Sequence, residues 1–489
     1  MKLSSVAAAL LLTLATPVFS VPLERRAAES SGDSSVPTTS AAVSATSAAS
    51  SSSAPVASAT PADSELASWI DEETTFSQNG ILANINPEGS VTGFITASPS
   101  KDSPDYFYSW TRDSALTIRS VLHMYNTSPS DDLVAVLKDF VTFQINAMNT
   151  DTVCDCLGEP KFNADGSSYT GAWGRPQNDG PAERATAMIL IANALNDNSS
   201  YVEDTLTPAI KQDLDYVVET WDQTCYDLWE EVNGLHFFTL MVMRRALIDG
   251  ASFLSDDSYT STAQEIETKL DSFYGDKDYI EVTQQLSGGA DYKSSGLDTS
   301  TLIAANVAGL GDGIYTPGSD KILATSLAIK EVFSDLYAIN ADSNSTGLSY
   351  AIGRYPEDKY DGLGTSEANP WFLCTLAFAE LYYRAIDEWK SAGSIEVTDA
   401  SAAFFQQFDS SAVSGTSYTA DSDDFNSIVQ AVAAEADTYF ARVQKHASDN
   451  TMSEQIDRDS GEEVGAKDLT WSYAAFVTAA AAYNGSPSA

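Results

Sequence analysis

The sequence predicts an all-α domain in which two concentric rings of helices share one core. Apolar residues recur at helical spacing along most of the chain, and the alternation typical of β-strands is nearly absent. Some of the helical runs are also apolar on every side, so they must be enclosed by other helices. An inner ring inside an outer ring satisfies that requirement.

The helical runs follow one another along the chain and number roughly a dozen. They begin near Ser114, Leu133, Pro181, Tyr201, Leu235, Thr260, Asp298, Ser319, Pro370, Asp424 and Lys467. Pro181 fits the first turn of a helix, where a proline costs no hydrogen bond. The runs Leu235–Leu254 and Leu469–Tyr483 are apolar nearly all round, which assigns them to the inner ring.

The N-terminal part of the chain differs in composition from the rest. An apolar run ends at the small-residue pattern Val18-Phe19-Ser20, so residues 1–20 are interpreted as a signal peptide of a secreted, extracellular protein. Residues 21–62 are rich in Ser, Thr and Ala and are expected to be a disordered leader. Arg25-Arg26 within it is either a dibasic processing site or a pair of exposed charges. The globular domain is expected to span residues 63–489.

The charge balance narrows the classes of partner. Lys and Arg number 26 against 69 Asp and Glu, which gives a formal net charge of -43. Nucleic acids and anionic membranes are repelled by such a surface, whereas a neutral polysaccharide is not. The chain holds only three histidines and no HExxH motif, so no metal or other cofactor is expected. We expect a monomer.

Four cysteines, Cys154, Cys156, Cys225 and Cys374, are too few for a disulfide scaffold. We expect one bridge at most, and the pairing among the first three stays open. Cys374 lies in an apolar run and is expected to be a buried free thiol.

A short acidic segment carries the first catalytic signal. Asp227-Leu228-Trp229-Glu230-Glu231 gathers three carboxylates and a tryptophan. Glycoside hydrolysis needs a carboxylic acid that stays protonated, and neighbouring negative charges raise a carboxyl pKa, so Glu230 fits the general acid. The same segment also fits a solvated acidic face of a helix.

An inverting glycosidase needs a second carboxylate, roughly 6.5–9.5 Å from the first, to activate water. On a helix, Asp227 lies one turn from Glu230, which is too close. Glu454 is therefore the better candidate for the base, and Asp227 is a second candidate if the segment is not helical. A raised-pKa acid beside an ionised base favours an acidic pH optimum.

Several loops combine aromatic rings with charged side chains. Sugar rings offer apolar faces for stacking and hydroxyls for bidentate charged partners. Trp110-Thr111-Arg112-Asp113, Trp173-Gly174-Arg175 and Arg354-Tyr355 supply that combination. Each motif alone also fits a core anchor or a structural ion pair, but together they favour a sugar site.

Longer strings carry a more specific signal. They are Ala97–Arg112 (ASPSKDSPDYFYSWTR), Leu157–Ala187 (LGEPKFNADGSSYTGAWGRPQNDGPAERATA), Tyr226–Gly234 (YDLWEEVNG), Gly353–Asp358 (GRYPED), Asn369–Leu376 (NPWFLCTL) and Ser453–Ala475 (SEQIDRDSGEEVGAKDLTWSYAA). In these strings and in their order the chain resembles the fungal glucoamylases, the glucan 1,4-α-glucosidases of glycoside hydrolase family 15. Residues 359–368 depart from the family pattern, so preferences that depend on that loop are not carried over.

The resemblance implies an (α/α)6 barrel with its site in loops at one end. It implies an inverting exo-enzyme that releases β-glucose from starch, glycogen and malto-oligosaccharides. Glu230 would be the acid and Glu454 the base, with Asp227 as the alternative proton acceptor. The substrate-binding residues it implies are Tyr106, Trp110, Arg112, Asp113, Trp173, Glu231, Arg354 and Trp371.

Two alternatives stay open. The same barrel could act on another α-glycoside, such as trehalose or an α-1,6-linked dextran, because one fold hosts several activities. A non-catalytic glycan-binding wall protein would keep the tryptophans without needing both Glu230 and Glu454.

Overall fold

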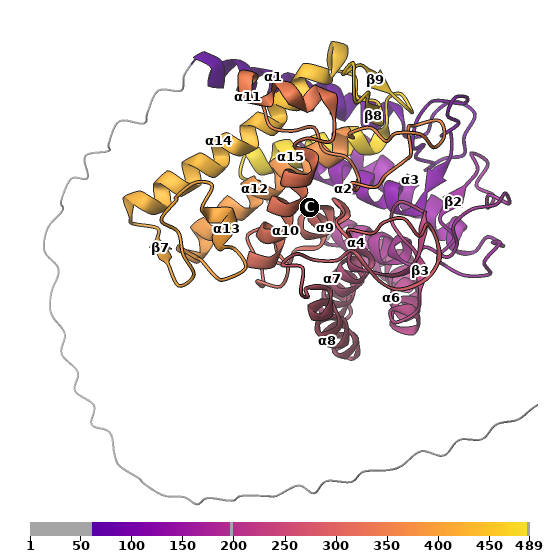
Figure 1. Ribbon diagram of the computed structural model, residues 1–489. Helices are drawn as coiled ribbons and strands as arrows, with labels where there is room; N and C mark the ends of the chain where they lie inside the picture. Colours follow the sequence, from indigo (N-terminus) through magenta and orange to yellow (C-terminus); the bar gives the residue numbers. More distant parts are fainter. Residues whose placement is uncertain (1–60, 196–198, 487–489) are drawn as a thin grey trace, which may run out of the picture. The chain divides into compact units, whose positions relative to one another are not determined.

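In the part of the chain that the structure describes, twelve long helices alternate between an inner and an outer ring (Figure 1). The computed structural model describes residues 61–195 and 199–486. The inner helices are α2 (Thr111–Thr127), α4 (Asp179–Ala194), α7 (Phe237–Leu254), α9 (Ser300–Ala308), α12 (Phe372–Ala392) and α15 (Thr470–Tyr483). The outer helices are α1 (Pro61–Ala83), α3 (Asp131–Met148), α6 (Thr207–Thr220), α8 (Ser258–Leu270), α10 (Asp320–Phe333) and α14 (Asp423–His446).

The inner helices form a closed ring. Each contacts the next in chain order, and α15 returns to contact α2. The outer helices pack against this ring, with α1 on α15, α3 on α2, α6 on α4, α8 on α7, α10 on α9 and α14 on α12. The predicted all-α architecture with two concentric rings, the (α/α)6 barrel, is confirmed.

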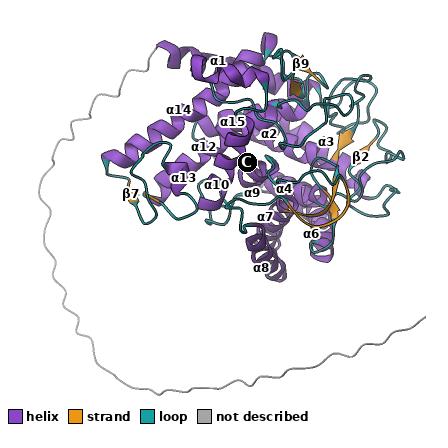
Figure 2. Ribbon diagram, in the orientation of Figure 1, coloured by secondary structure: helices purple, strands orange, loops and turns teal. Residues whose placement is uncertain are grey.

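The remaining elements are short. The minor helices are α5 (Ser199–Tyr201), η1 (Val202–Leu206), η2 (Asp271–Phe273), η3 (Ala338–Asp342), α11 (Ser343–Thr346), α13 (Ala402–Phe405) and η4 (Ser448–Asn450). The strands are β1 (Ser109–Trp110), β2 (Lys161–Phe162), β3 (Cys225–Tyr226), β4 (Val232–His236), β5 (Thr283–Gly289), β6 (Ser394–Glu396), β7 (Ser417–Thr419), β8 (Gln455–Ile456) and β9 (Glu463–Val464). They pair antiparallel as β1-β2, β3-β4-β5, β6-β7 and β8-β9, and Figure 2 shows them as small orange pieces among the loops.

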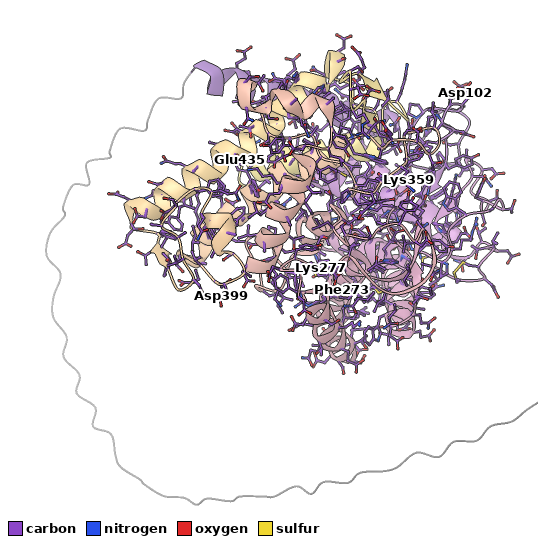
Figure 3. All side chains as sticks on the ribbon, viewed as in Figure 1. Asp102, Phe273, Lys277, Lys359, Asp399 and Glu435 are labelled. Atoms are coloured by element: carbon purple, nitrogen blue, oxygen red, sulfur yellow. A yellow bond between two sulfur atoms is a disulfide. The ribbon has the colours of Figure 1, made fainter. Side chains whose placement is uncertain are left out.

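The two runs assigned to the inner ring became α7 and α15, and both are buried on nearly every side. Close approach of α7 to α6 requires Gly250, since a Cβ there would lie 2.3 Å from Leu214 Cδ1. At the first residue of α7, Phe237 packs edge-on against Phe273, which is labelled in Figure 3. Contacts of this kind keep the apolar faces of α7 out of water, as a helix that is apolar all round requires.

The N-terminal predictions are largely outside the described residues. The signal peptide at 1–20 lies there, as does the leader at 21–62 except for residues 61 and 62, which begin α1. No helix within 61–195 or 199–486 is both long and apolar enough to cross a bilayer.

One disulfide occurs in the described part of the chain, between Cys154 and Cys156. Cys225 and Cys374 are buried free thiols, as predicted for Cys374. The bridge closes a loop of the chain that precedes β2 and leaves the helical rings free of covalent cross-links among the described residues.

Ion pairs join neighbouring helices, both within the outer ring and between the two rings. On one side of the barrel, Lys330 of α10 pairs with Glu435 of the outer helix α14, labelled in Figure 3, at 2.6 Å. Deeper, Arg184 of the inner helix α4 donates two hydrogen bonds to Asp213 of α6, at 2.8 and 2.6 Å, and both side chains are fully buried. Because neither group has access to water, each depends on the other for its charge.

Replacing Arg184 with methionine leaves the Asp213 carboxylate buried without a cation. We expect the free energy of unfolding to fall by about 3–5 kcal/mol. The double variant Arg184→Met/Asp213→Leu removes both charges and should recover most of that loss. As a control, Lys211→Met breaks the exposed Lys211–Asp215 pair of the same helix and should cost less than about 0.5 kcal/mol. Urea denaturation followed by circular dichroism measures all three, and a double variant no more stable than the single one would refute the role of the unpaired charge.

Candidate active site

A cavity of about 390 Å³ lies where the loops before several inner helices meet. It is lined by Ala97, Tyr106, Trp110, Arg112, Asp113, Trp173, Gly174, Leu228, Trp229, Glu230, Glu231, Arg354, Tyr360, Trp371, Glu454, Leu469 and Trp471. The structure therefore brings Glu230, Glu454 and all eight residues proposed to bind substrate into one cavity. Asp227 is not among the lining residues.

Glu230 stands in a tight turn between β3 and β4, with a φ of 68° that lies in the left-handed region. The alternative reading of this segment as an acidic helix face is therefore wrong. Glu230 Oε1 accepts three hydrogen bonds, from Trp110 Nε1 at 2.6 Å, Trp173 Nε1 at 2.9 Å and Gln177 Nε2 at 2.9 Å. An oxygen surrounded by donors cannot itself carry a proton, so a proton on this carboxyl group belongs to Oε2.

Asp227 lies beneath the turn that it begins. Its Oδ1 accepts the backbone N–H groups of Glu231 at 2.7 Å and Val232 at 2.9 Å. Its Oδ2 lies 3.2 Å from Lys293 Nζ. Burial raises the pKa of Asp227, but the Lys293 ammonium and these hydrogen bonds outweigh it and hold the pKa below its ordinary value. A carboxylate with these bonds holds the turn in shape.

Glu454 is held at the start of β8 by short-range contacts. Its N–H donates to Ala466 O at 2.8 Å, and its Oε2 accepts from Gln455 Nε2 at 3.1 Å. Gly465 has to be glycine, because its φ is 78° and a Cβ would lie 2.6 Å from Glu454 Oε2. These backbone and side-chain contacts fix the orientation of the Glu454 carboxylate.

The pKa of Glu454 is raised to about 7, chiefly because the group is buried. A hydrogen bond from Tyr106 and the charge of Arg354 act in the opposite direction. Since a base must be ionised to accept a proton, the raised pKa opposes the acidic optimum expected from the sequence.

Glu230 and Glu454 reach the cavity from opposite sides of the barrel. Glu230 precedes α7, the third helix of the inner ring, and Glu454 precedes α15, the sixth. In a closed ring of six helices these two positions face each other. The two carboxylates are therefore carried by loops that belong to opposite helices of the inner ring, and both line the cavity.

Arg354 joins several walls of the cavity. Its Nη2 donates to Glu231 Oε1 at 2.7 Å, and Nε and Nη2 donate to the two oxygens of Asp358 at 2.7 and 2.6 Å. Its guanidinium carbon lies 5.3 Å from the ring centroids of Trp229 and Trp371. Burial raises the pKa of Glu231, and the Arg354 charge opposes that shift. The cavity thus holds a fixed cation with planar donors, the type of group that binds sugar hydroxyls.

Arg112 and Asp113 form a second polar wall at the start of α2. Arg112 Nη1 donates to Gln177 Oε1 at 3.0 Å and Asp179 Oδ2 at 2.9 Å. Asp113 Oδ2 lies 3.4 Å from Arg112 Nη2 but forms no hydrogen bond within the described residues. Burial raises the pKa of Asp113 to about 6. A buried polar atom that lacks a hydrogen bond can accept one from a ligand.

The comparisons with known proteins agree with one another. The family model for glycosyl hydrolases family 15 matches residues 75–481. This chain belongs to glycosyl hydrolase family 15. Glucoamylase 1 of Rhizopus oryzae is 51% identical over 441 residues, which cover 87% of this chain and 72% of that protein. Glucoamylase-1 of Schizophyllum commune is 39% identical over 86% of this chain and 74% of its own length.

Among solved structures, the family 15 glucoamylase of Hypocrea jecorina superposes with a TM-score of 0.80 at 34% identity, covering 86% of this chain and 73% of that one. The family resemblance drawn from the sequence is thereby confirmed, as is the prediction of a glycoside hydrolase.

Some lining residues of this family 15 site were missed from the sequence. Tyr360 hydrogen-bonds Tyr106 at 2.6 Å, from the very loop that departs from the family pattern. The rings of Trp229 and Trp471 stack with their centroids 6.2 Å apart. Trp229 Nε1 also donates a hydrogen bond to Asp298 Oδ1 at 2.9 Å. Both tryptophans lie within the sequence strings that carry the family resemblance, and that position could have identified them as candidate site residues. Conversely, Arg175 does not line the cavity and pairs with Glu159 at 2.6 Å.

Among the residues that the structure describes, no group of three or more His, Cys, Asp or Glu side chains is placed to hold a metal ion. The polar residues that line the cavity carry carboxylates, guanidinium groups, indole N–H groups and tyrosine hydroxyls, which can act on a ligand by proton transfer, hydrogen bonding and charge.

Replacing Tyr106 with phenylalanine tests the environment of Glu454. The Tyr106 hydrogen bond favours the carboxylate, so without it the pKa of Glu454 rises. If Glu454 is the base, activity needs its ionised form, and the low-pH limb of kcat/KM moves to higher pH by up to about one unit. Tyr418→Phe, which removes a hydroxyl bonded to Asp409, is the control and should leave the limb in place. An unchanged limb in Tyr106→Phe would show that Glu454 does not govern it.

Proposed function

We propose that this family 15 enzyme is a secreted, inverting exo-glucoamylase, which removes glucose from the non-reducing ends of α-1,4-linked glucans and, more slowly, α-1,6-linked ones. The glucoamylase names of its relatives support the substrate class. The observation that supports the mechanism is that Glu230 and Glu454 both line one cavity, on loops that precede the third and the sixth helix of the inner ring. Starch, glycogen and malto-oligosaccharides are the proposed substrates.

In this mechanism Glu230 is the general acid. Its Oε2 gives a proton to the glycosidic oxygen while Oε1 stays fixed by three donors. The C1–O bond breaks, and its electron pair remains on the oxygen, which becomes a hydroxyl of the shortened chain. Glu454 accepts a proton from a water molecule that attacks C1 from the other face. Attack opposite to departure inverts the anomeric centre and yields β-glucose.

The remaining lining residues would bind the sugar. Arg112, Asp113 and Arg354 would hold hydroxyls of the terminal glucose, with Asp113 Oδ2 free to accept one. Trp173 and Glu231 would contact the adjoining sugar. The rings of Tyr106, Trp110 and Trp371 would form apolar walls. A cavity of about 390 Å³ is of the size that takes a sugar unit or two, which favours attack at a chain end.

Asp227 is better suited to positioning than to catalysis. It lies outside the cavity lining, and its oxygens are already bonded to two backbone N–H groups and to Lys293. We therefore retain Glu454 as the base and assign to Asp227 the shape of the turn that carries Glu230.

Secretion and organisation belong to the same proposal. Residues 1–20 have the pattern of a signal peptide, residues 21–62 that of a spacer, and residues 63–489 would be the catalytic domain of a monomer. The large excess of acidic residues keeps a protein soluble outside the cell and does not repel a neutral glucan.

Proton NMR of the anomeric region during maltotriose digestion tests the mechanism. We expect β-glucose to appear first. Glu230→Gln and Glu454→Gln should each lower kcat by about 10²–10⁴-fold, because each removes one proton transfer. Initial release of α-glucose would overturn the inverting mechanism, because that product requires retention of configuration. An active Glu454→Gln beside an inactive Asp227→Asn would instead move the base to Asp227.

Substrate choice separates this proposal from another barrel α-glycosidase. We expect kcat/KM to be highest for maltose, lower for isomaltose and negligible for trehalose. Each is measured by glucose release at equal enzyme concentration. Trehalose or isomaltose cleaved faster than maltose would favour a trehalase or a dextran-cleaving enzyme.

A further inference from the structure

Lys161 lies behind the cavity wall and is not among the residues that line the cavity. It stands in β2 directly opposite Trp110 of β1, and it is only 3% exposed. Four aromatic rings surround its ammonium, with Nζ at 3.7 Å from the ring centroid of Trp173, 4.0 Å from Tyr108, 4.4 Å from Tyr169 and 4.5 Å from Trp110. No carboxylate in the described part of the chain forms an ion pair with Nζ. Cation–π interactions with the four rings stabilise the ammonium charge instead.

Backbone pairing fixes this position. Lys161 pairs with Trp110 in the β1-β2 ladder, Thr111 N–H donates to Pro160 O at 2.9 Å, and Tyr169 N–H donates to Lys161 O at 3.0 Å. Backbone pairing therefore holds the lysine opposite the tryptophan.

Two of the four rings connect Lys161 to the proposed acid. Trp110 and Trp173 both donate their indole N–H to Glu230 Oε1, at 2.6 and 2.9 Å. A cation over a ring face draws π-electron density toward itself, and polarised groups in a chain strengthen the next hydrogen bond. The Lys161 charge thus makes both indoles better donors.

We propose that Lys161 is a positioning residue that makes Glu230 a stronger proton donor, acting through the indoles of Trp110 and Trp173. The inference rests on the proposed function. When Glu230 Oε2 gives its proton to the leaving oxygen, the group becomes a carboxylate, and its new charge falls partly on Oε1. Stronger donors at Oε1 stabilise that carboxylate and so lower the barrier to proton transfer.

The charge state of Lys161 is compatible with this role. Burial lowers the pKa of Lys161 to about 8, while the negative charge of Glu230 opposes that shift. The ammonium is therefore charged throughout the acidic range. The competing interpretation is that Lys161 only holds the aromatic wall together.

A comparison of two leaving groups separates these interpretations. Maltose needs a proton on its leaving oxygen, whereas α-D-glucosyl fluoride loses fluoride ion with little help from an acid. We expect Lys161→Met to lower kcat for maltose roughly tenfold and to leave kcat for the fluoride within about twofold. Lys161→Arg keeps the charge and should retain most of the activity on maltose.

Lys138→Met is the matched control, because Lys138 of α3 lies over the Tyr201 ring at 5.1 Å and does not line the cavity. It should leave both rates unchanged. An equal loss on both substrates in Lys161→Met would mean a wall residue only, and no loss on either would also overturn the proposal. If the wild-type enzyme hydrolyses the fluoride but not maltose, the proposed function fails instead, since the acid step itself would be missing.

Discussion

The arrangement of the site depends on the buried ion pairs that the Lys293 ammonium forms with Asp227 and Asp298. Nζ lies 2.8 Å from Asp298 and 3.2 Å from Asp227, and all three side chains are nearly inaccessible to water. Burial lowers the pKa of Lys293, but the two carboxylates outweigh it and raise the pKa above its ordinary value. Asp227 shapes the turn that carries Glu230, while Asp298 accepts the Ser300 N–H at the start of α9 at 2.8 Å. One cation thereby ties the catalytic turn to the next helix of the inner ring.

The two rings could be predicted from the sequence because apolar periodicity reports burial directly. The run predicted from Leu235 became α7 from Phe237, and the run predicted from Leu469 became α15 from Thr470. The turn at Asp227–Glu231 could not be predicted in the same way. Its shape depends on Lys293, which lies 66 residues from Asp227 in the sequence, and on a left-handed backbone at Glu230 that no local pattern announces.

Some residues of the candidate site could likewise be predicted from the sequence, and others could not. Motifs that combine aromatic and charged residues revealed Trp110, Arg112 and Trp173, since their composition alone suits a sugar. Tyr360 and Lys161 escaped because a tyrosine in a variable loop and a single lysine have many ordinary uses. Their significance depends on the rings that surround them, and only the folded barrel supplies those neighbours.

The helix starts around the cavity have an electrostatic consequence. Trp110, Trp371 and Leu469 are the N-caps of α2, α12 and α15; all three line the cavity, and none caps its helix with a side-chain hydrogen bond. Each helix N-terminus carries about half a positive elementary charge from its aligned peptide dipoles. Three such ends converge on a cavity that holds the carboxylates Asp113, Glu230, Glu231 and Glu454. The backbone itself thus supplies a positive field that lets a strongly acidic protein concentrate negative groups at one point.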